Sequence, residues 1–261
     1  MGISTFSNDA YGSAVADTVS CARDAEQLAG AAGRAGFWTR TFTGTVNVAD
    51  VKASVLHAAS VLSAGDYFLL TFSSHGYPPY GNSPRGWAFS DAKFDRDTLG
   101  PSDSIERWLR AFAAGVRILI VANCCFAAAQ LPADRALVLP WRVIKYLAFR
   151  DQRNADLNPA TFDLRTFTDS PATPMYESHI YELSASAADA EAFDGISASE
   201  MSPFTREVYA LVTGGAYSSF DDFMTKLVAN AAAAKIPEPV LTPYDAVSAA
   251  FAATGPYRVP S

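Results

Sequence analysis

The sequence predicts an α/β fold with a mostly parallel central sheet flanked by helices, and two apolar runs carry most of that prediction. Residues 66–74 run into His75-Gly76, and residues 116–123 run into Cys124-Cys125. Both runs are short, rich in β-branched or aromatic residues and nearly continuous in apolar residues. This pattern is typical of strands that are buried on both faces of a parallel sheet.

The N-terminal third alternates strand and helix signals. Residues 1–4 resemble the tail of a first strand, which we expect to be truncated. Residues 14–35 are alanine-rich with a helical apolar stripe that ends before Gly36, and the stripe consists of Cys21, Ala25, Leu28 and Ala32. Residues 47–64 repeat the pattern, with Asn47 as the expected cap and a stripe of Val51, Val55, Ala58 and Leu62. With the strand at 66–74 they form a βαβ unit, whose crossover is almost always right-handed.

The rest of the chain continues the pattern after one interruption. We expect a helix over 104–114 before the strand at 116–123, a strand over 180–185, and helices over 203–212 and 219–234. Residues 130–176 carry charges, prolines and a candidate helix at 141–154, and they read as a long excursion from the sheet or a linker. The whole chain, 1–261, is expected to form one domain.

Composition narrows the class of protein. Apolar residues make up 49% and charged residues 18%, as in ordinary globular proteins, and the net charge of −7 disfavours nucleic acid as a partner. No signal peptide and no apolar stretch long enough for a membrane span are visible. Three cysteines cannot form a disulfide framework and suggest a reducing compartment, so we expect a cytoplasmic protein.

The two predicted strand ends bring an imidazole and a thiol to one rim, because chemistry in an open parallel sheet collects at the carboxyl ends of its strands. Ordinary readings compete with a catalytic one. A histidine at a strand end is often structural, and a buried cysteine is often a small hydrophobic residue, which is our expectation for Cys124 and Cys21. Ser73 and Ser74 do not sit in the Gly-x-Ser-x-Gly elbow of serine hydrolases.

Three segments resemble the metacaspases and bacterial caspase-like peptidases. Residues 63–76 (SAGDYFLLTFSSHG) resemble the family's strand that ends in His-Gly, and residues 115–128 (GVRILIVANCCFAA) resemble its strand that ends in the nucleophile. Residues 183–194 (LSASAADAEAFD) resemble the strand and loop beside its specificity pocket. The separation of His75 and Cys125, 125 − 75 = 50 residues, agrees with the His-to-Cys interval in caspases. The resemblance implies a caspase-like sandwich.

The resemblance also implies a mechanism and its residues. Cys125 would be the nucleophile that attacks a peptide carbonyl, and His75 would be its base. The backbone amides of Gly76 and Cys125 would form the oxyanion hole. Asn123 and Asp189 would bind substrate, with Asp194 as another possible anion. No cofactor and no metal are implied, and the expected partner is a peptide or protein substrate.

Several positions depart from the family pattern. Asn123 stands where the family has an aspartate, which weakens the case for a basic substrate side chain. Residues 126–128 replace the family's His-Ser-Gly, and the loop at 84–89 lacks the carboxylates that bind calcium in metacaspases. These departures keep two alternatives open. One is a caspase-like fold without turnover that acts as a binding or regulatory module, and the other is a different thiol chemistry such as transpeptidation.

Overall fold

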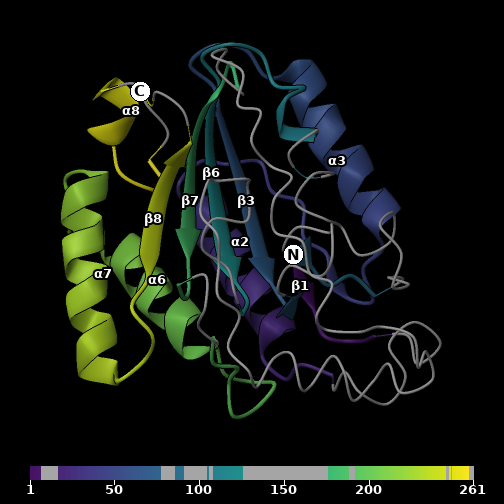
Figure 1. Cartoon of the computed structure of the whole chain (residues 1–261), viewed down its shortest axis with the longest axis vertical. Helices are drawn as coiled ribbons and strands as arrows, with labels where there is room; N and C mark the ends of the chain where they lie inside the picture. Colours follow the sequence, from purple (N-terminus) through teal and green to yellow (C-terminus); the bar gives the residue numbers. More distant parts are fainter. Residues whose placement is uncertain are drawn as a thin grey trace, which may run out of the picture.

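The computed structural model describes residues 1–6, 17–77, 86–90, 105, 108–125, 176–187, 192–244, 247 and 249–258. At its centre is a six-stranded sheet in the order β2-β1-β3-β6-β7-β8 (Figure 1). The strands are β1 Gly2–Ile3, β2 Thr43–Gly44, β3 Tyr67–Ser73, β6 Arg117–Asn123, β7 His179–Ser184 and β8 Val240–Tyr244. The first five are parallel, and β8 pairs antiparallel with β7. The predicted α/β class is therefore confirmed.

The two strands that motivated the prediction lie side by side. β3 and β6 pair along their whole length, from Tyr67 opposite Arg117 to Ser73 opposite Asn123. Alternate side chains of β6 enter different cores, with Ile118 and Ile120 on one face of the sheet and Leu119 on the other. All three are almost fully buried. This two-sided burial explains why the sequence of β6 is continuously apolar rather than alternating.

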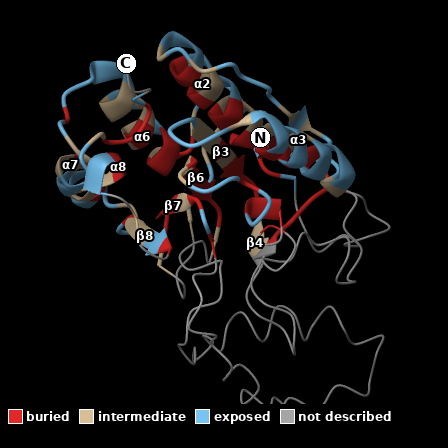
Figure 2. Ribbon diagram, turned by 90° about the horizontal axis from the view of Figure 1, so that it is seen from above, coloured by how far each residue is buried: buried red, intermediate tan, exposed pale blue. Residues whose placement is uncertain are grey.

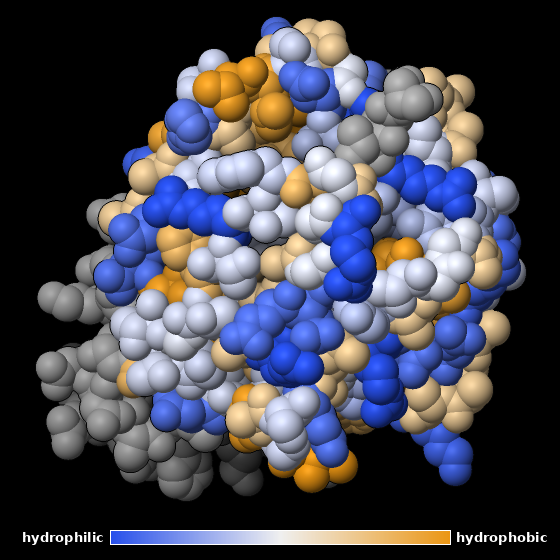
Figure 3. Space-filling model, turned by 180° about the vertical axis from the view of Figure 1, so that it is seen from behind, coloured by the Kyte–Doolittle hydropathy of each residue, from blue (hydrophilic) through white to orange (hydrophobic). Residues whose placement is uncertain are grey.

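Helices cover both faces of the sheet. α2 (Cys21–Arg34), α6 (Pro203–Gly214) and α7 (Phe220–Ala234) contribute to the core that contains Leu119, while α3 (Val48–Val61) contributes to the opposite core. Figure 2 shows α2 and α6 on the same side of the sheet, with buried residues along their inner surfaces. Seen from behind, the surface is mostly hydrophilic with small, separated apolar patches (Figure 3). The short helix α8 (Ala249–Ala252) contributes Phe251 to the same core as α2, α6 and α7.

Some element boundaries differ from the predictions. α2 begins at Cys21 rather than near residue 14, because the backbone of residues 19 and 20 is instead hydrogen-bonded to the carboxylate of Asp194. Asn47 is the N-cap of α3, but its side chain makes no capping hydrogen bond. Strand β8 was not predicted from the sequence. It contains Pro243, which an edge strand tolerates because one side of it needs no partner.

A small hairpin follows the His75 strand. β4 (Gly76–Tyr77) pairs antiparallel with β5 (Gly86–Trp87), and Trp87 stacks on Phe72 of β3 with ring centroids 4.2 Å apart. The predicted excursion at 130–176 and its helix at 141–154 lie outside the described residues apart from Tyr176. Within the part of the chain that is described, no helix is long and apolar enough to span a bilayer.

Candidate active site

His75 and Cys125 both follow the carboxyl ends of neighbouring strands. β3 ends at Ser73 and β6 ends at its register partner Asn123, so each candidate residue lies two positions beyond its strand. The backbone N–H of Ser74 donates to the carbonyl of Asn123 at 3.2 Å, which continues the pairing past the strand ends. The topology therefore delivers the imidazole and the thiol to the same rim of the sheet, as the sequence predicts.

His75 is fixed by a backbone hydrogen bond and a ring contact. Its carbonyl accepts a hydrogen bond from the N–H of Ala88 at 3.0 Å, and its ring lies 5.2 Å from the ring of Phe6 between centroids. The residue is half-buried, so its imidazole is neither sealed in the core nor fully solvated. A half-buried imidazole on an anchored backbone is suited to exchanging a proton with a neighbouring group.

Gly76 brings the histidine segment into direct contact with the cysteine segment. A Cβ built on Gly76 would lie 2.0 Å from the carbonyl oxygen of Cys125 and 3.1 Å from the Sγ of Cys124. No side chain fits at 2.0 Å from a backbone oxygen, so the contact requires glycine at this position. The residue after His75 is thus packed against the backbone of the candidate nucleophile.

The three cysteines fall into two groups. Cys21 and Cys124 are buried, and desolvation raises the pKa of the Cys21 thiol to about 12 and that of Cys124 well above its usual value. Both thiols therefore stay protonated at neutral pH and are poor nucleophiles. Cys125 is half-buried, and its Sγ lies 3.9 Å from the carbonyl oxygen of Ala192. Among the three, Cys125 is the thiol that a substrate can approach.

The segment after β7 lies next to the cysteine pair. The hydroxyl of Ser186 donates to the carbonyl of Cys124 at 3.5 Å, and Ala192 contacts Cys125 as described. Asp189, a predicted substrate-binding residue, lies outside the described residues. Asp194 accepts hydrogen bonds from the backbone of Val19 and Ser20 and from the Ser20 hydroxyl. Its carboxylate therefore fixes the two residues that directly precede α2.

Asn123 belongs to a buried polar cluster that lies beneath this rim. Its Nδ2 donates to the carboxylate of Asp24 at 2.9 Å and lies within hydrogen-bond distance of the hydroxyls of Ser73, at 3.1 Å, and Ser202, at 2.7 Å. Its Oδ1 is buried and has no hydrogen-bond partner within the described residues. Asn123 thus lies two residues before the candidate nucleophile and has one buried acceptor atom, Oδ1, without a hydrogen-bond donor among the described residues.

Asp24 is the residue of this cluster that sequence reasoning missed. The sequence analysis assigns it no role, yet it is fully buried. A signal was available: Asp24 lies three residues after Cys21 and four before Leu28, which places a carboxylate on the apolar stripe of α2. A charged residue on a buried helical face calls for a partner in the fold.

The described residues contain no group of three or more histidine, cysteine or acidic side chains arranged to hold a metal ion. The expected independence from metals and cofactors stays a prediction.

Comparison with known proteins shows the fold. No family model and no curated protein sequence matches the chain. Among solved structures, protein GSU0716 from Geobacter sulfurreducens superposes with a TM-score of 0.71 at 22% identity, over 100% of this chain and 97% of that one. Caspase-1 from Spodoptera frugiperda superposes with a TM-score of 0.54 at 11% identity, over 92% of this chain and 83% of the caspase.

The fold is caspase-like. The caspase-like sandwich inferred from the three sequence segments is therefore confirmed at the level of architecture. At these identities the likeness concerns the fold alone, and the chemistry of this caspase-like chain has to be argued from its own residues.

Proposed function

We propose that this chain is a cysteine endopeptidase of the metacaspase or bacterial caspase-like type, which hydrolyses peptide bonds through Cys125 and His75. The observation that carries the proposal is the packing of Gly76 against the backbone of Cys125 at the shared rim of β3 and β6. It makes the residue next to the imidazole and the residue that bears the thiol immediate neighbours. The burial of the other two thiols supports Cys125 as the reacting group.

In the proposed reaction, His75 accepts the thiol proton and the Cys125 thiolate attacks the carbonyl carbon of the scissile bond. Backbone N–H groups of Gly76 and Cys125 stabilise the oxyanion that forms. His75 then donates the proton to the leaving amine as the C–N bond breaks, and an acyl-enzyme remains. Water hydrolyses this thioester, with His75 again as the base, and releases the second product.

Substrate binding by Asn123 and Asp189 belongs to the same proposal. Asn123 is 6% exposed and its Nδ2 is already within bonding distance of three acceptors, so its proposed role rests on its position, where the family that the chain resembles has a substrate-binding aspartate. Because none of the three cysteines, all of which the structure describes, forms a disulfide, a reducing compartment such as the cytoplasm suits the proposed chemistry.

Hydrolysis of an unbiased peptide library tests the proposal without a guess at specificity. Products would be identified by mass spectrometry for the parent, Cys125→Ala and Cys124→Ala. We expect cleavage by the parent, none by Cys125→Ala, and most of the parent rate in Cys124→Ala. Equal residual cleavage in all three proteins would contradict the proposal and favour a binding or regulatory role for the fold, whereas ligated products would indicate transpeptidation.

A further inference from the structure

One carboxylate joins the two strands that lead to His75 and Cys125. Oδ2 of Asp24, on α2, accepts a hydrogen bond from Ser73 Oγ at 2.6 Å and another from Asn123 Nδ2 at 2.9 Å. Ser73 closes β3 and Asn123 closes β6, and the two are register partners whose side chains also lie 3.1 Å apart. A single oxygen atom of Asp24 is therefore shared by the last residue of each strand.

The second oxygen of Asp24 fixes the carboxylate to another helix. Oδ1 accepts a hydrogen bond from the backbone N–H of Ser202 at 2.8 Å, and Ser202 is the N-cap of α6. The carboxylate is thus held between α2, where it originates, and the first turn of α6. Since both of its oxygens are bound, it cannot swing away from the strand ends without breaking several buried hydrogen bonds.

The cluster is sealed from solvent. Asp24 and Ser202 are fully buried, and Ser73 and Asn123 are 3% and 6% exposed. Among the described residues no lysine or arginine forms a salt bridge with Asp24, and burial raises the pKa of its carboxyl although hydrogen bonds from Ser73, Ser202 and Asn123 oppose that shift. A buried carboxylate without a cation is costly, so its hydrogen-bond donors have to stay in place.

We propose that Asp24 is a positioning residue for the proposed reaction: by binding Ser73 and Asn123 it sets the separation and orientation of the two strand ends that carry His75 and Cys125. The role rests on the proposed function, because it presupposes a working imidazole–thiol pair. Asp24 itself touches no reacting atom. Small displacements of catalytic groups have large effects, since a misplacement of about 1 Å can cost about a hundredfold in rate.

The test measures the rate of Cys125 alkylation by limiting iodoacetamide at pH 6, together with the melting temperature. Mass spectrometry of peptides assigns labelling to each cysteine. The variants are Asp24→Asn, which removes the charge, and Ser73→Ala, which removes one hydroxyl and so keeps the test available if Asp24→Asn does not fold. His75→Ala defines the rate without the imidazole.

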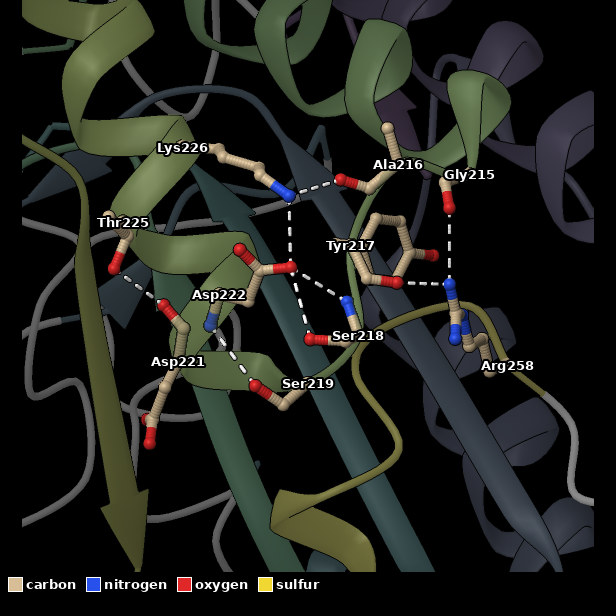
Figure 4. Close-up of polar contacts among 10 residues, drawn as sticks. All are labelled: Gly215, Ala216, Tyr217, Ser218, Ser219, Asp221, Asp222, Thr225, Lys226 and Arg258. Atoms are coloured by element: carbon tan, nitrogen blue, oxygen red, sulfur yellow. Dashed lines mark hydrogen bonds and ion pairs between the residues drawn. The ribbon is translucent and has the colours of Figure 1, made fainter.

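Two matched controls separate positioning from general weakening of the fold. Asp222→Asn removes another carboxylate that accepts three hydrogen bonds, two from Ser218 and one from Lys226 (Figure 4). Val208→Ala, at a fully buried position of α6, lowers the melting temperature without touching the cluster. Both controls are expected to label Cys125 within about twofold of the parent rate.

We expect Asp24→Asn and Ser73→Ala to slow labelling of Cys125 at pH 6 by about tenfold or more and to move its pH midpoint toward about 8.5, the value of an ordinary thiol. Fast, His75-dependent labelling that both variants leave unchanged would overturn the positioning role alone. Equal slowing in Val208→Ala at the same loss of melting temperature would overturn it as well. Slow labelling of the parent with or without His75 would overturn the proposed function, and the positioning role with it.

Discussion

Gly76 lies so close to Cys125 that a Cβ on the glycine would stand 2.0 Å from the cysteine's carbonyl oxygen. The contact joins the segment that follows β3 to the segment that follows β6. Two residues far apart in the sequence thus approach closely through their backbones. Any side chain at position 76 must push the two segments apart.

Gly76→Ala is therefore expected to damage the site more than the fold. Overpacking of this kind costs about 1–3 kcal/mol of unfolding free energy, which urea denaturation can measure. Labelling of Cys125 at pH 6 should fall by about tenfold or more, because the His75 segment is displaced. The matched control is Gly33→Ala in α2, where an added Cβ meets nothing within 4 Å. That variant should be more stable by about 1 kcal/mol and label normally, and normal labelling of Gly76→Ala would contradict the account.

Cys124 is expected to behave as a small core residue. It is 1% exposed, and desolvation raises the pKa of its thiol well above the usual value. In the folded protein below pH 8 it should stay unlabelled by iodoacetamide, and it should react only after denaturation. Cys124→Ala should lower the unfolding free energy by about 1 kcal/mol and leave the labelling of Cys125 within about twofold. Fast labelling of Cys124 in the native protein would reverse the assignment of the nucleophile.

Asp194 should make the fold sensitive to acid. Partial desolvation alone would raise the pKa of this carboxyl, but hydrogen bonds from the Ser20 hydroxyl and from the backbone of residues 19, 20 and 195 outweigh it and lower the pKa. A lowered pKa in the folded state means that the carboxylate stabilises the protein above the unfolded-state pKa, about 3.9, and that this contribution is lost as pH falls through the folded-state pKa.

Urea midpoints of the parent and Asp194→Asn at pH 7, 5 and 3 test this. We expect the variant to be less stable at pH 7 and 5, by no more than about 1 kcal/mol because the side chain is exposed, and the gap to narrow at pH 3. A gap that stays constant over the whole range would show that the charge of Asp194 does not stabilise the fold.

The sequence predicted the strands that lead to His75 and Cys125 better than it predicted the hydrogen bonds between residues remote in the sequence. β3 and β6 were placed to within one residue, because strands with helices on both faces of the sheet leave a short, nearly continuous apolar run. β8 was missed because an edge strand that contains Pro243 lacks such a run. The start of α2 was misplaced because it depends on hydrogen bonds from residues 19 and 20 to Asp194, which is remote in the sequence.

Asp24 shows the same limit at the level of a single side chain. Its place on the apolar stripe of α2 marks it as unusual, but its partners come from three other elements: Ser73 from β3, Asn123 from β6 and Ser202 from α6. Only the tertiary fold brings these groups together. Local periodicity reports which face of a helix is buried, and it says nothing of what lies opposite.

Whether His75 and Cys125 act as a pair can be read from the pH dependence of Cys125 alkylation. An ordinary thiol with a pKa of about 8.5 is about 0.3% thiolate at pH 6, whereas a thiol paired with an imidazole is largely ionised there. Rates for each cysteine would be measured from pH 5 to 8 in the parent and in His75→Ala. If the two residues act as a pair, Cys125 is labelled fast at pH 6 in the parent and about tenfold or more slowly in His75→Ala. Slow labelling at pH 6 in both proteins, rising only toward pH 8, would contradict it.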